Sequence, residues 1–280
     1  MVAEPVAGYG QGMTTTLDPV RASHACVRAP GNAPGRLLSL AQRSAWLEQG
    51  YLGPFDLVTP GEMQRLRAAI DREIFITEAQ RPAPERDHDR HLDQPAVWEL
   101  CSHPALVERV ADLIGPDLIL WRSNFQDKPA GGPAVPWHQD GTYFDLQPCI
   151  LVSAWIAIDE ATTANGCLQI IPGSHRSLQA HRHDPTRSTF SHSLAPTPEE
   201  IGRAVSFPLA PGQCLLFNEF TTHGSGPNTT GARRLGLTPR ITVPFVRIPM
   251  SGDGQPRLVS LLRGSDYTRE LRLAPPPLRR

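Results

Sequence analysis

Two stretches of the sequence, CILVSAWIAI (149–158) and RLGLTPRITVPFVR (234–247), carry a strong β-strand pattern. Both are rich in β-branched and large apolar residues, which pack well on the pleated surface of a sheet. Similar short runs, separated by Pro, Gly or Asn, recur at 118–126, 167–171, 205–209 and 213–218. From residue 118 onward the sequence therefore predicts a succession of short strands.

Helices are predicted before this point. Segment 37–49 is amphipathic and is followed by Gly50, a residue type that often ends helices. A second helix is predicted from Thr59, because TPGE (59–62) supplies an N-cap, a proline in the first turn and a capping-box glutamate. A third is predicted over 102–115. Helices followed by short strands predict a mainly β fold, a barrel or jelly roll with N-terminal helices packed on one face.

The chain length of 280 residues suits one large domain. Residues 1–35 are rich in Gly, Pro, Ala and Thr and lack a periodic apolar pattern, so we expect a flexible leader. Residues 36–250 carry the predicted helices and strands of the domain. Residues 251–280 form a C-terminal extension, and its basic, proline-rich end (LAPPPLRR) is expected to be a flexible tail.

The composition argues against several classes of partner. Hydrophobic residues make up 40% of the chain and the formal net charge is -1, so the charge predicts neither a nucleic-acid nor a membrane partner. Apolar runs are too short to cross a bilayer, and the first residues do not resemble a signal peptide. The five cysteines are far apart, without a C-x-x-C pair, and are expected to be reduced thiols. We expect a cytoplasmic protein with a small-molecule partner.

A candidate metal site begins at WHQD (137–140). His138 and Asp140 are two residues apart, and on an extended segment such side chains point to the same side. His223, in TTHGSGPN (221–228), follows a predicted strand and could supply a third ligand. Two histidines and one carboxylate form the facial triad of non-haem iron(II) oxygenases, which leaves sites open for a co-substrate and O₂. The alternative is a hydrogen-bonded surface pair in a Pro-Gly loop.

Arg234 is a candidate partner for the distal carboxylate of a 2-oxo diacid, because a guanidinium can pair with a carboxylate through two hydrogen bonds. Arg233 is a rival, and strand parity separates them. If 233–240 is a strand, Arg234, Thr238 and Arg240 share a polar interior face, whereas Arg233 lies with the leucines on the face packed under helices.

The same parity applied to 149–158 separates two faces. Ile150 and the residues at alternate positions after it form an apolar face, and Ser153 and Trp155 lie on the other. Ser153 and Trp155 are therefore predicted to line the pocket. A position in the core is the alternative for Trp155.

These motifs resemble the phytanoyl-CoA dioxygenase family. The resemblance extends over residues 37–250 and rests on WHQD, NGCLQIIPGSH (165–175), HGSGPN (223–228) and RRLGLTPR (233–240). Within this family, the sequence is most similar to the branch of aliphatic amino-acid halogenases, whose substrates are tethered to carrier proteins. This similarity rests on WHQ, GYLGPFDLVTPGEM (50–63), DRHLD (89–93) and LIGPDLILWR (113–122).

The resemblance implies a double-stranded β-helix, or cupin-like jelly-roll barrel, with ferrous iron, 2-oxoglutarate as co-substrate and O₂. It implies that His138, Asp140 and His223 are the iron ligands and that Arg234 binds the distal carboxylate of 2-oxoglutarate. The other residues implied near the co-substrate or the open metal site are Trp155, Arg240, Gln126 and Ser225. A plain salt bridge is the alternative role for Arg240.

The halogenases carry a small residue where this chain has Asp140, and halide binds in the vacated site. The expected reaction is therefore hydroxylation of an unactivated C–H bond in a small, amino-acid-like molecule of specialised metabolism, free or carrier-tethered. The alternatives are a halogenase that tolerates Asp140, another radical outcome such as desaturation or cyclisation, and a non-catalytic metal-binding jelly roll.

Further histidines have other expected roles. HDRHLD (88–93) has a metal-like composition, but we expect a lid or substrate wall there. His181 and His183 lie in the polar stretch 176–200, where we expect a mobile segment over the active-site mouth or a plain surface loop. We expect His175 to have a structural role at a turn.

Overall fold

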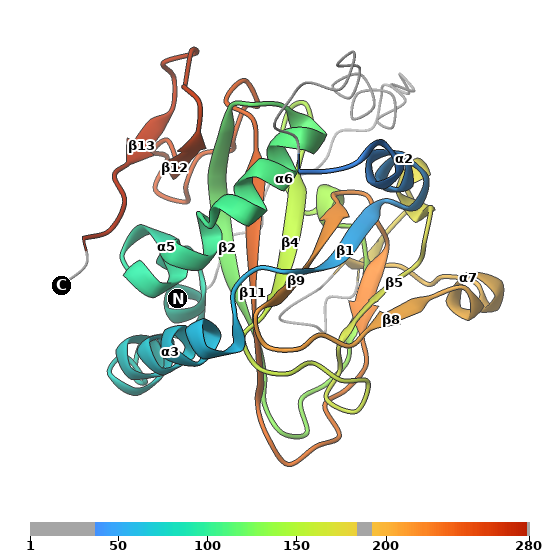
Figure 1. The fold of residues 1–280 in the computed structure, drawn as a ribbon. Coiled ribbons are helices and arrows are strands. Elements are labelled where there is room, and N and C mark those ends of the chain that lie inside the picture. The colour runs from blue at the N-terminus through green and yellow to red at the C-terminus, as the bar shows by residue number, and fades with distance from the viewer. Residues whose placement is uncertain (1–36, 184–191, 279–280) are drawn as a thin grey trace, which may run out of the picture.

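The computed structural model describes residues 37–183 and 192–278, and the leader predicted at 1–35 lies outside this part of the chain. Two sheets form the main part of the fold (Figure 1). The larger sheet has the order β1 (Tyr51–Asp56), β9 (Gln213–Asn218), β4 (Val152–Ala157), β11 (Arg234–Thr242), β2 (Leu118–Lys128), β12 (Leu258–Arg263) and β13 (Arg272–Ala274). The smaller has the order β3 (Val135–His138), β10 (His223–Ser225), β5 (Leu168–Ile170) and β8 (Val205–Phe207). Neighbouring strands are antiparallel except β12 and β13. The predicted jelly roll is confirmed.

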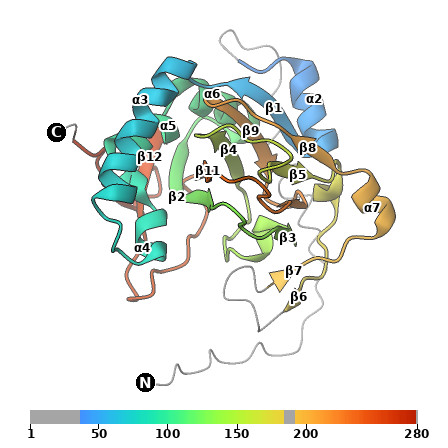
Figure 2. The same ribbon diagram turned by 90° about the horizontal axis from the view of Figure 1, so that it is seen from below.

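Short helices surround the sheets, and most of them lie on one side of the larger sheet (Figure 2). Regular α-helices are α2 (Leu40–Gln49), α3 (Pro60–Ile70), α4 (Ala83–Asp87), α5 (Pro95–Cys101), α6 (Pro104–Ile114) and α7 (Pro198–Gly202). Shorter or wider turns are η1 (Asp71–Ile76), η2 (Arg90–Leu92), η3 (Asp140–Thr142) and η4 (Ser174–Arg176). Apolar side chains of α3, α5 and α6 form the main core together with those of β2, β4 and β11.

The ends of two helices follow the predicted capping signals. Ser39 is the N-cap of α2, and Gly50 ends it with φ 79°, a left-handed conformation that glycine adopts without a steric cost. Thr59 caps α3, and the reciprocal bond from Glu62 is present. The third helix begins at Pro104 with His103 as its N-cap, so the predicted start at Ser102 is wrong; Ser102 instead ends α5.

Strand parity agrees with the alternation in the sequence. On β4, Ala154 and Ile156 lie in the main core under the helices, whereas Trp155 and Ala157 belong to a second apolar cluster that includes Phe217. Alternate residues of a strand point to opposite faces of the sheet. One face of the larger sheet therefore packs against helices and the other faces the interior of the barrel.

Two segments hold more structure than expected. Part of the polar stretch 176–200 forms the two-stranded pair β6 (Arg182–His183) and β7 (His192–Ser193), while residues 184–191 lie outside the described chain. In the C-terminal extension, β12 pairs with β2 and so widens the main sheet. Among the described residues, no helix is long and apolar enough to span a membrane.

Candidate metal centre

Three side chains predicted as metal ligands converge between the two sheets. His138 ends β3, Asp140 opens η3, and His223 opens β10, where it is the cross-strand partner of His138. One ligand atom from each residue lies within 4.8 Å of the others. All three residues are buried. The extended backbone of β3 continues through Gln139, and the chain then turns at Asp140, so His138 and Asp140 do not lie on one continuous extended segment as expected.

Backbone carbonyls orient both imidazoles. His138 Nδ1 is 2.8 Å from the carbonyl oxygen of Pro136, and His223 Nδ1 is 2.8 Å from that of Thr221. A carbonyl can only accept, so each Nδ1 carries the proton and each Nε2 keeps a lone pair. Burial lowers the pKa of His138 to about 3 and also lowers the pKa of His223. Both rings are therefore neutral ligands at physiological pH.

Two polar side chains hold the carboxylate of Asp140. Arg240 contacts both of its oxygens, and Ser153 Oγ donates to Oδ2 at 3.1 Å. Burial acts to raise the pKa of Asp140, but the charge of Arg240 and its hydrogen bonds outweigh it and hold that pKa well below its usual range. The carboxylate is ionised, as a metal ligand must be.

This donor set fits a ferrous ion. Two neutral imidazole nitrogens and one ionised carboxylate, close together and buried, are the ligands of the facial triad. His138 and His223 also line a pocket of about 270 Å³, which offers room for further ligands beside them.

Arg234 lies in the same pocket, on the predicted interior face of β11. Its Nη groups donate to the backbone carbonyls of Gln126 and Gly166, but its buried Nε has no partner. Its guanidinium lies 5.2 Å from the centre of the Trp155 ring. The same ring packs closely against Gly236, because a Cβ atom on residue 236 would lie only 2.6 Å from it. Among the described residues, no carboxylate forms an ion pair with Arg234. Arg234 and Trp155 line the pocket as strand parity predicted, whereas Ser153, which was expected beside them, does not line it and bonds Asp140 instead.

Lys128 is a second cation in this pocket, and the sequence analysis did not select it. Its Nζ donates to Ser225 Oγ at 2.7 Å and to the carbonyl of Gly226 at 2.5 Å, and no described carboxylate pairs with it. Burial, with the nearby charge of Arg234, lowers the pKa of Lys128 to about 8. A signal was present, because Lys128 is the only lysine of the chain and has the parity of Gln126, which also lines the pocket.

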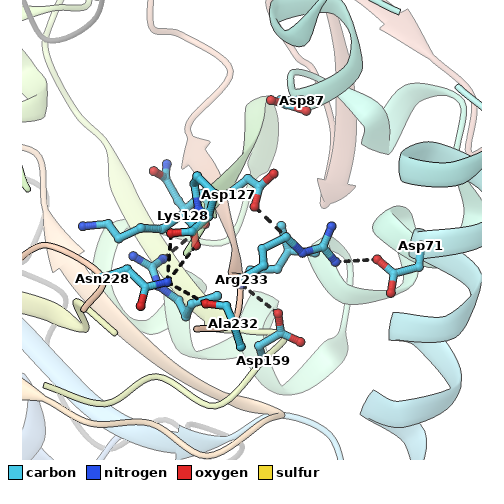
Figure 3. A network of polar contacts seen from close by, with 12 residues as sticks. Asp71, Asp87, Asp127, Lys128, Asp159, Asn228, Ala232 and Arg233 are labelled. Atoms are coloured by element: carbon cyan, nitrogen blue, oxygen red, sulfur yellow. Dashed lines mark hydrogen bonds and ion pairs between the residues drawn. The ribbon is translucent and has the colours of Figure 1, made fainter. Parts of the chain in front are cut away.

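Arg233 points toward Asp71, on the side opposite to Lys128, as Figure 3 shows. Its Nη2 is 2.5 Å from Asp71 in η1, its Nε is 3.9 Å from Asp127, and its guanidinium lies 4.6 Å from the Phe75 ring centre. Arg233 thus joins the helical layer to the larger sheet, which is the role that parity predicted.

Asn228 from the HGSGPN motif fixes the end of β2 (Figure 3). Its side-chain amide donates to the carbonyls of Lys128, Pro129 and Ala232 over 2.8–3.1 Å. The asparagine therefore ties the loop before β11 to the strand that carries Lys128.

The remaining histidines have separate roles. His91 is buried and bonds Ser123 through Nδ1, whereas His88 is only partly buried beside β2, and the expected role of the HDRHLD loop as a lid or substrate wall stays a prediction. His181 Nε2 accepts a hydrogen bond from the backbone N–H of Gln139, between the two metal-site residues. His175 is buried in η4, and its Nε2 bonds the carbonyl of Leu47, in agreement with a structural role.

Comparisons of sequence point to one family. The profile of the phytanoyl-CoA dioxygenase (PhyH) family matches residues 46–236. A probable phytanoyl-CoA dioxygenase of Caenorhabditis elegans is 27% identical over 238 residues, which cover 73% of this chain and 75% of that protein. The peroxisomal phytanoyl-CoA dioxygenase of Homo sapiens is 25% identical over 229 residues, covering 72% of this chain and 68% of that protein.

Solved structures agree with this result. ThoJ, a non-heme monooxygenase in its apo form, has a TM-score of 0.72 and 27% identity over 84% of this chain and 88% of its own. CytC3, solved with Fe(II) and α-ketoglutarate (2-oxoglutarate), has a TM-score of 0.67 and 26% identity over 85% of this chain and 93% of its own. The chain belongs to the phytanoyl-CoA dioxygenase family of iron(II)- and 2-oxoglutarate-dependent oxygenases.

Proposed function

We propose that this oxygenase hydroxylates an unactivated C–H bond of a small, amino-acid-like molecule of specialised metabolism. The observation that carries the proposal is a buried His-Asp-His set, whose two histidines line the same pocket as two buried cations without a carboxylate partner in the described chain. The His-Asp-His set matches the ligands of ferrous iron. The two cations match the distal carboxylate of a diacid co-substrate.

His138, Asp140 and His223 are the proposed iron ligands. Hydrogen bonds to the backbone and to Arg240 already hold the three donors in place, so little reorganisation is needed when the ion binds. Bound iron(II), with 2-oxoglutarate, supplies the activation of O₂ that the oxidation of a C–H bond requires. The surrounding protein positions that bond and limits the access of water.

Arg234 and Lys128 are proposed to bind the distal carboxylate of 2-oxoglutarate. Burying two cations without a counter-ion is costly, and an anionic ligand removes that cost. Ser225 Oγ accepts from Lys128, which leaves the hydroxyl proton of Ser225 free to donate to the same carboxylate. Trp155 stacks against Arg234 and restricts its orientation, and Gln126 completes this part of the pocket.

Asp140 favours hydroxylation over halogenation. A side-chain carboxylate stands where the related halogenases have a small residue, so a halide has no vacated protein site. The likeness to amino-acid halogenases supports an amino-acid-like substrate, either free or tethered to a carrier protein.

The test measures metal content and co-substrate turnover. Wild-type protein is expected to bind one Fe(II) per chain and to form succinate from 2-oxoglutarate, whereas His138→Ala and His223→Ala lose both properties. His183→Ala is the matched control, because this histidine is exposed and lies outside the metal set. Full iron binding and turnover in both site variants would refute the assignment. Metal binding without succinate formation would favour a non-catalytic jelly roll.

A further inference from the structure

We infer that Arg122 forms an anion-binding site beside the metal centre and receives a carboxylate of the substrate. The inference rests on the proposed function, because it concerns the molecule that binds next to the iron site. It goes further by naming the chemical group by which that molecule is recognised.

The regular alternation of β2 places Arg122 on the metal side of the sheet, on the face that also carries Gln126 and Lys128. Arg122 on β2 is the cross-strand partner of Arg240 on β11, and the register then shifts so that Trp121 is an extra residue. Directly paired residues present their side chains on the same face of a sheet. Arg122 therefore lies on the face from which Arg240 reaches Asp140.

Arg122 has only weak partners in the described chain. Its Nε is 3.9 Å from Asp89 Oδ1, which is too long for a hydrogen bond, and this buried nitrogen has no acceptor. Its Nη2 donates to His88 Nδ1 over 3.4 Å. His88 Nδ1 therefore carries no proton, and the ring can donate only through Nε2. The guanidinium of Arg122 thus keeps donor capacity that the protein does not use.

The local charges leave this region positive. Three arginines, Arg122, Arg240 and Arg257, gather around two carboxylates. Asp89 is shared between Arg122 and Arg257, at 3.9 and 3.4 Å, and Asp140 is committed to the metal site. Burial lowers the pKa of Arg122, the charges of Arg240 and Arg257 act in the same direction, and that of Asp89 opposes them. An anionic group brought here would supply the missing charge.

A carboxylate fits this site better than a neutral carbonyl. The planar guanidinium can donate two parallel hydrogen bonds to a carboxylate, and 21% of the side-chain surface of Arg122 is still exposed. The acyl end of a carrier-bound thioester has no such charge. The site therefore favours a free acid over a carrier-tethered substrate, two possibilities that the sequence left open.

The experiment uses full-length protein loaded with Mn(II) and saturated with 2-oxoglutarate, so that Arg234 and Lys128 are already occupied. The probes are small aliphatic and α-amino acids, each with its primary amide and its N-acetylcysteamine thioester. Paramagnetic broadening of probe proton signals reports binding near the metal, with Zn(II) as the diamagnetic reference. The acids are expected to bind at least about tenfold more tightly than their amides and thioesters, as a charge-assisted contact requires.

Variants identify the residue responsible. Arg122→Leu should remove the preference for acids and leave the affinities for Mn(II) and 2-oxoglutarate unchanged, while Arg122→Lys should restore part of the preference. Arg109→Leu is the matched control. Arg122 lies 5.7 Å from the centre of the Trp121 ring, and Arg109 likewise lies 4.5 Å from that of Phe55, but on the outer helix α6.

The outcomes separate the two proposals. Equal binding of acids and amides to wild-type protein, or an unchanged preference in Arg122→Leu, would overturn this inference alone. The wild-type comparison decides the matter even where Arg122→Leu does not fold. Failure of the wild-type protein to bind Mn(II) with 2-oxoglutarate would instead overturn the proposed function, and the inference with it.

Discussion

Arg240 donates to both carboxylate oxygens of Asp140, with Nε 3.3 Å from Oδ2 and Nη2 3.3 Å from Oδ1. Both side chains are buried, and Arg240 also donates to Asn124 across the sheet. The pair keeps Asp140 ionised in a position where burial alone would favour the protonated acid. Arg240 is thus more than a plain salt bridge, because it prepares a proposed metal ligand before the metal binds.

Arg240→Met should destabilise the metal-free protein more than the metal-bound protein. The variant leaves the carboxylate of Asp140 buried without a cation, which costs about 3 kcal/mol in comparable pairs. Saturating Mn(II) supplies a replacement charge and should reduce the deficit. Chemical denaturation with and without Mn(II) measures both values, and Arg247→Met, at an exposed arginine, is the control. Equal deficits in the two conditions would contradict a role for Arg240 in preparing the metal ligand.

Arg234→Leu should weaken 2-oxoglutarate binding severely, by about 2–5 kcal/mol, because a buried carboxylate loses a charge-assisted partner. Arg233→Leu should instead lower the free energy of unfolding, since Arg233 joins η1 to the sheet through Asp71. Calorimetric titration of the co-substrate and thermal denaturation distinguish the two variants. The reverse order of effects would show that the roles of these neighbouring arginines have been exchanged.

Lys128 should make co-substrate binding depend on pH. Burial lowers its pKa to about 8 in the free protein, so the ammonium loses its proton, and with it its attraction for a carboxylate, as the pH rises through that value. The affinity for 2-oxoglutarate should therefore fall above pH 8. Lys128→Met should bind more weakly throughout and lose this dependence. A wild-type affinity that stays constant from pH 7 to about 9.5 would argue against contact between Lys128 and the co-substrate.

Glu219 should make stability fall as the pH rises. Burial raises its pKa to about 8, whereas the unfolded chain has an ordinary glutamate pKa of about 4.3. Between these values the folded state binds one more proton, so the free energy of unfolding decreases with increasing pH and is constant on either side. Glu219→Gln should remove this slope and stabilise the protein at pH 8 by at least about 1 kcal/mol. Denaturation at several pH values tests this, with exposed Glu160→Gln as the control.

The features that the sequence predicted correctly are mostly local. The capping box at Thr59 and the glycine after α2 depend on a few neighbouring residues. The opposite roles of Arg233 and Arg234 follow from alternation along a single strand, which needs no knowledge of the strand's neighbours. The three predicted metal ligands come from two motifs far apart in the chain, and the resemblance to a known family supported their combination into one site.

The features that the sequence did not predict depend on pairing between distant strands. Lys128 falls two residues beyond the strand expected at 118–126, because pairing with β11 extends β2 to its position. The position of Arg122 opposite Arg240 follows from the register of the same two strands. The strand β12 was likewise not predicted, because its short apolar sequence gives no local signal and its position beside β2 depends on pairing between distant segments. Local pattern cannot reveal such register.

We propose that Asp140 determines the class of reaction. With its carboxylate on the metal, the third protein site is filled and a halide finds no vacancy, so the wild-type product should be heavier by one oxygen atom even in excess chloride. Asp140→Gly should vacate that site, weaken iron binding and strongly reduce hydroxylation, because Arg240 and Ser153 then have no carboxylate to position. Halogenation by this variant also depends on how the substrate is held, so its absence would not count against the assignment. The measurement is the product mass after turnover with 2-oxoglutarate and chloride, and Ser153→Ala is a milder control, which keeps the ligand and loses one donor. A chlorinated product from the wild-type enzyme would show that Asp140 does not occupy the metal site, and the protein would then be a halogenase.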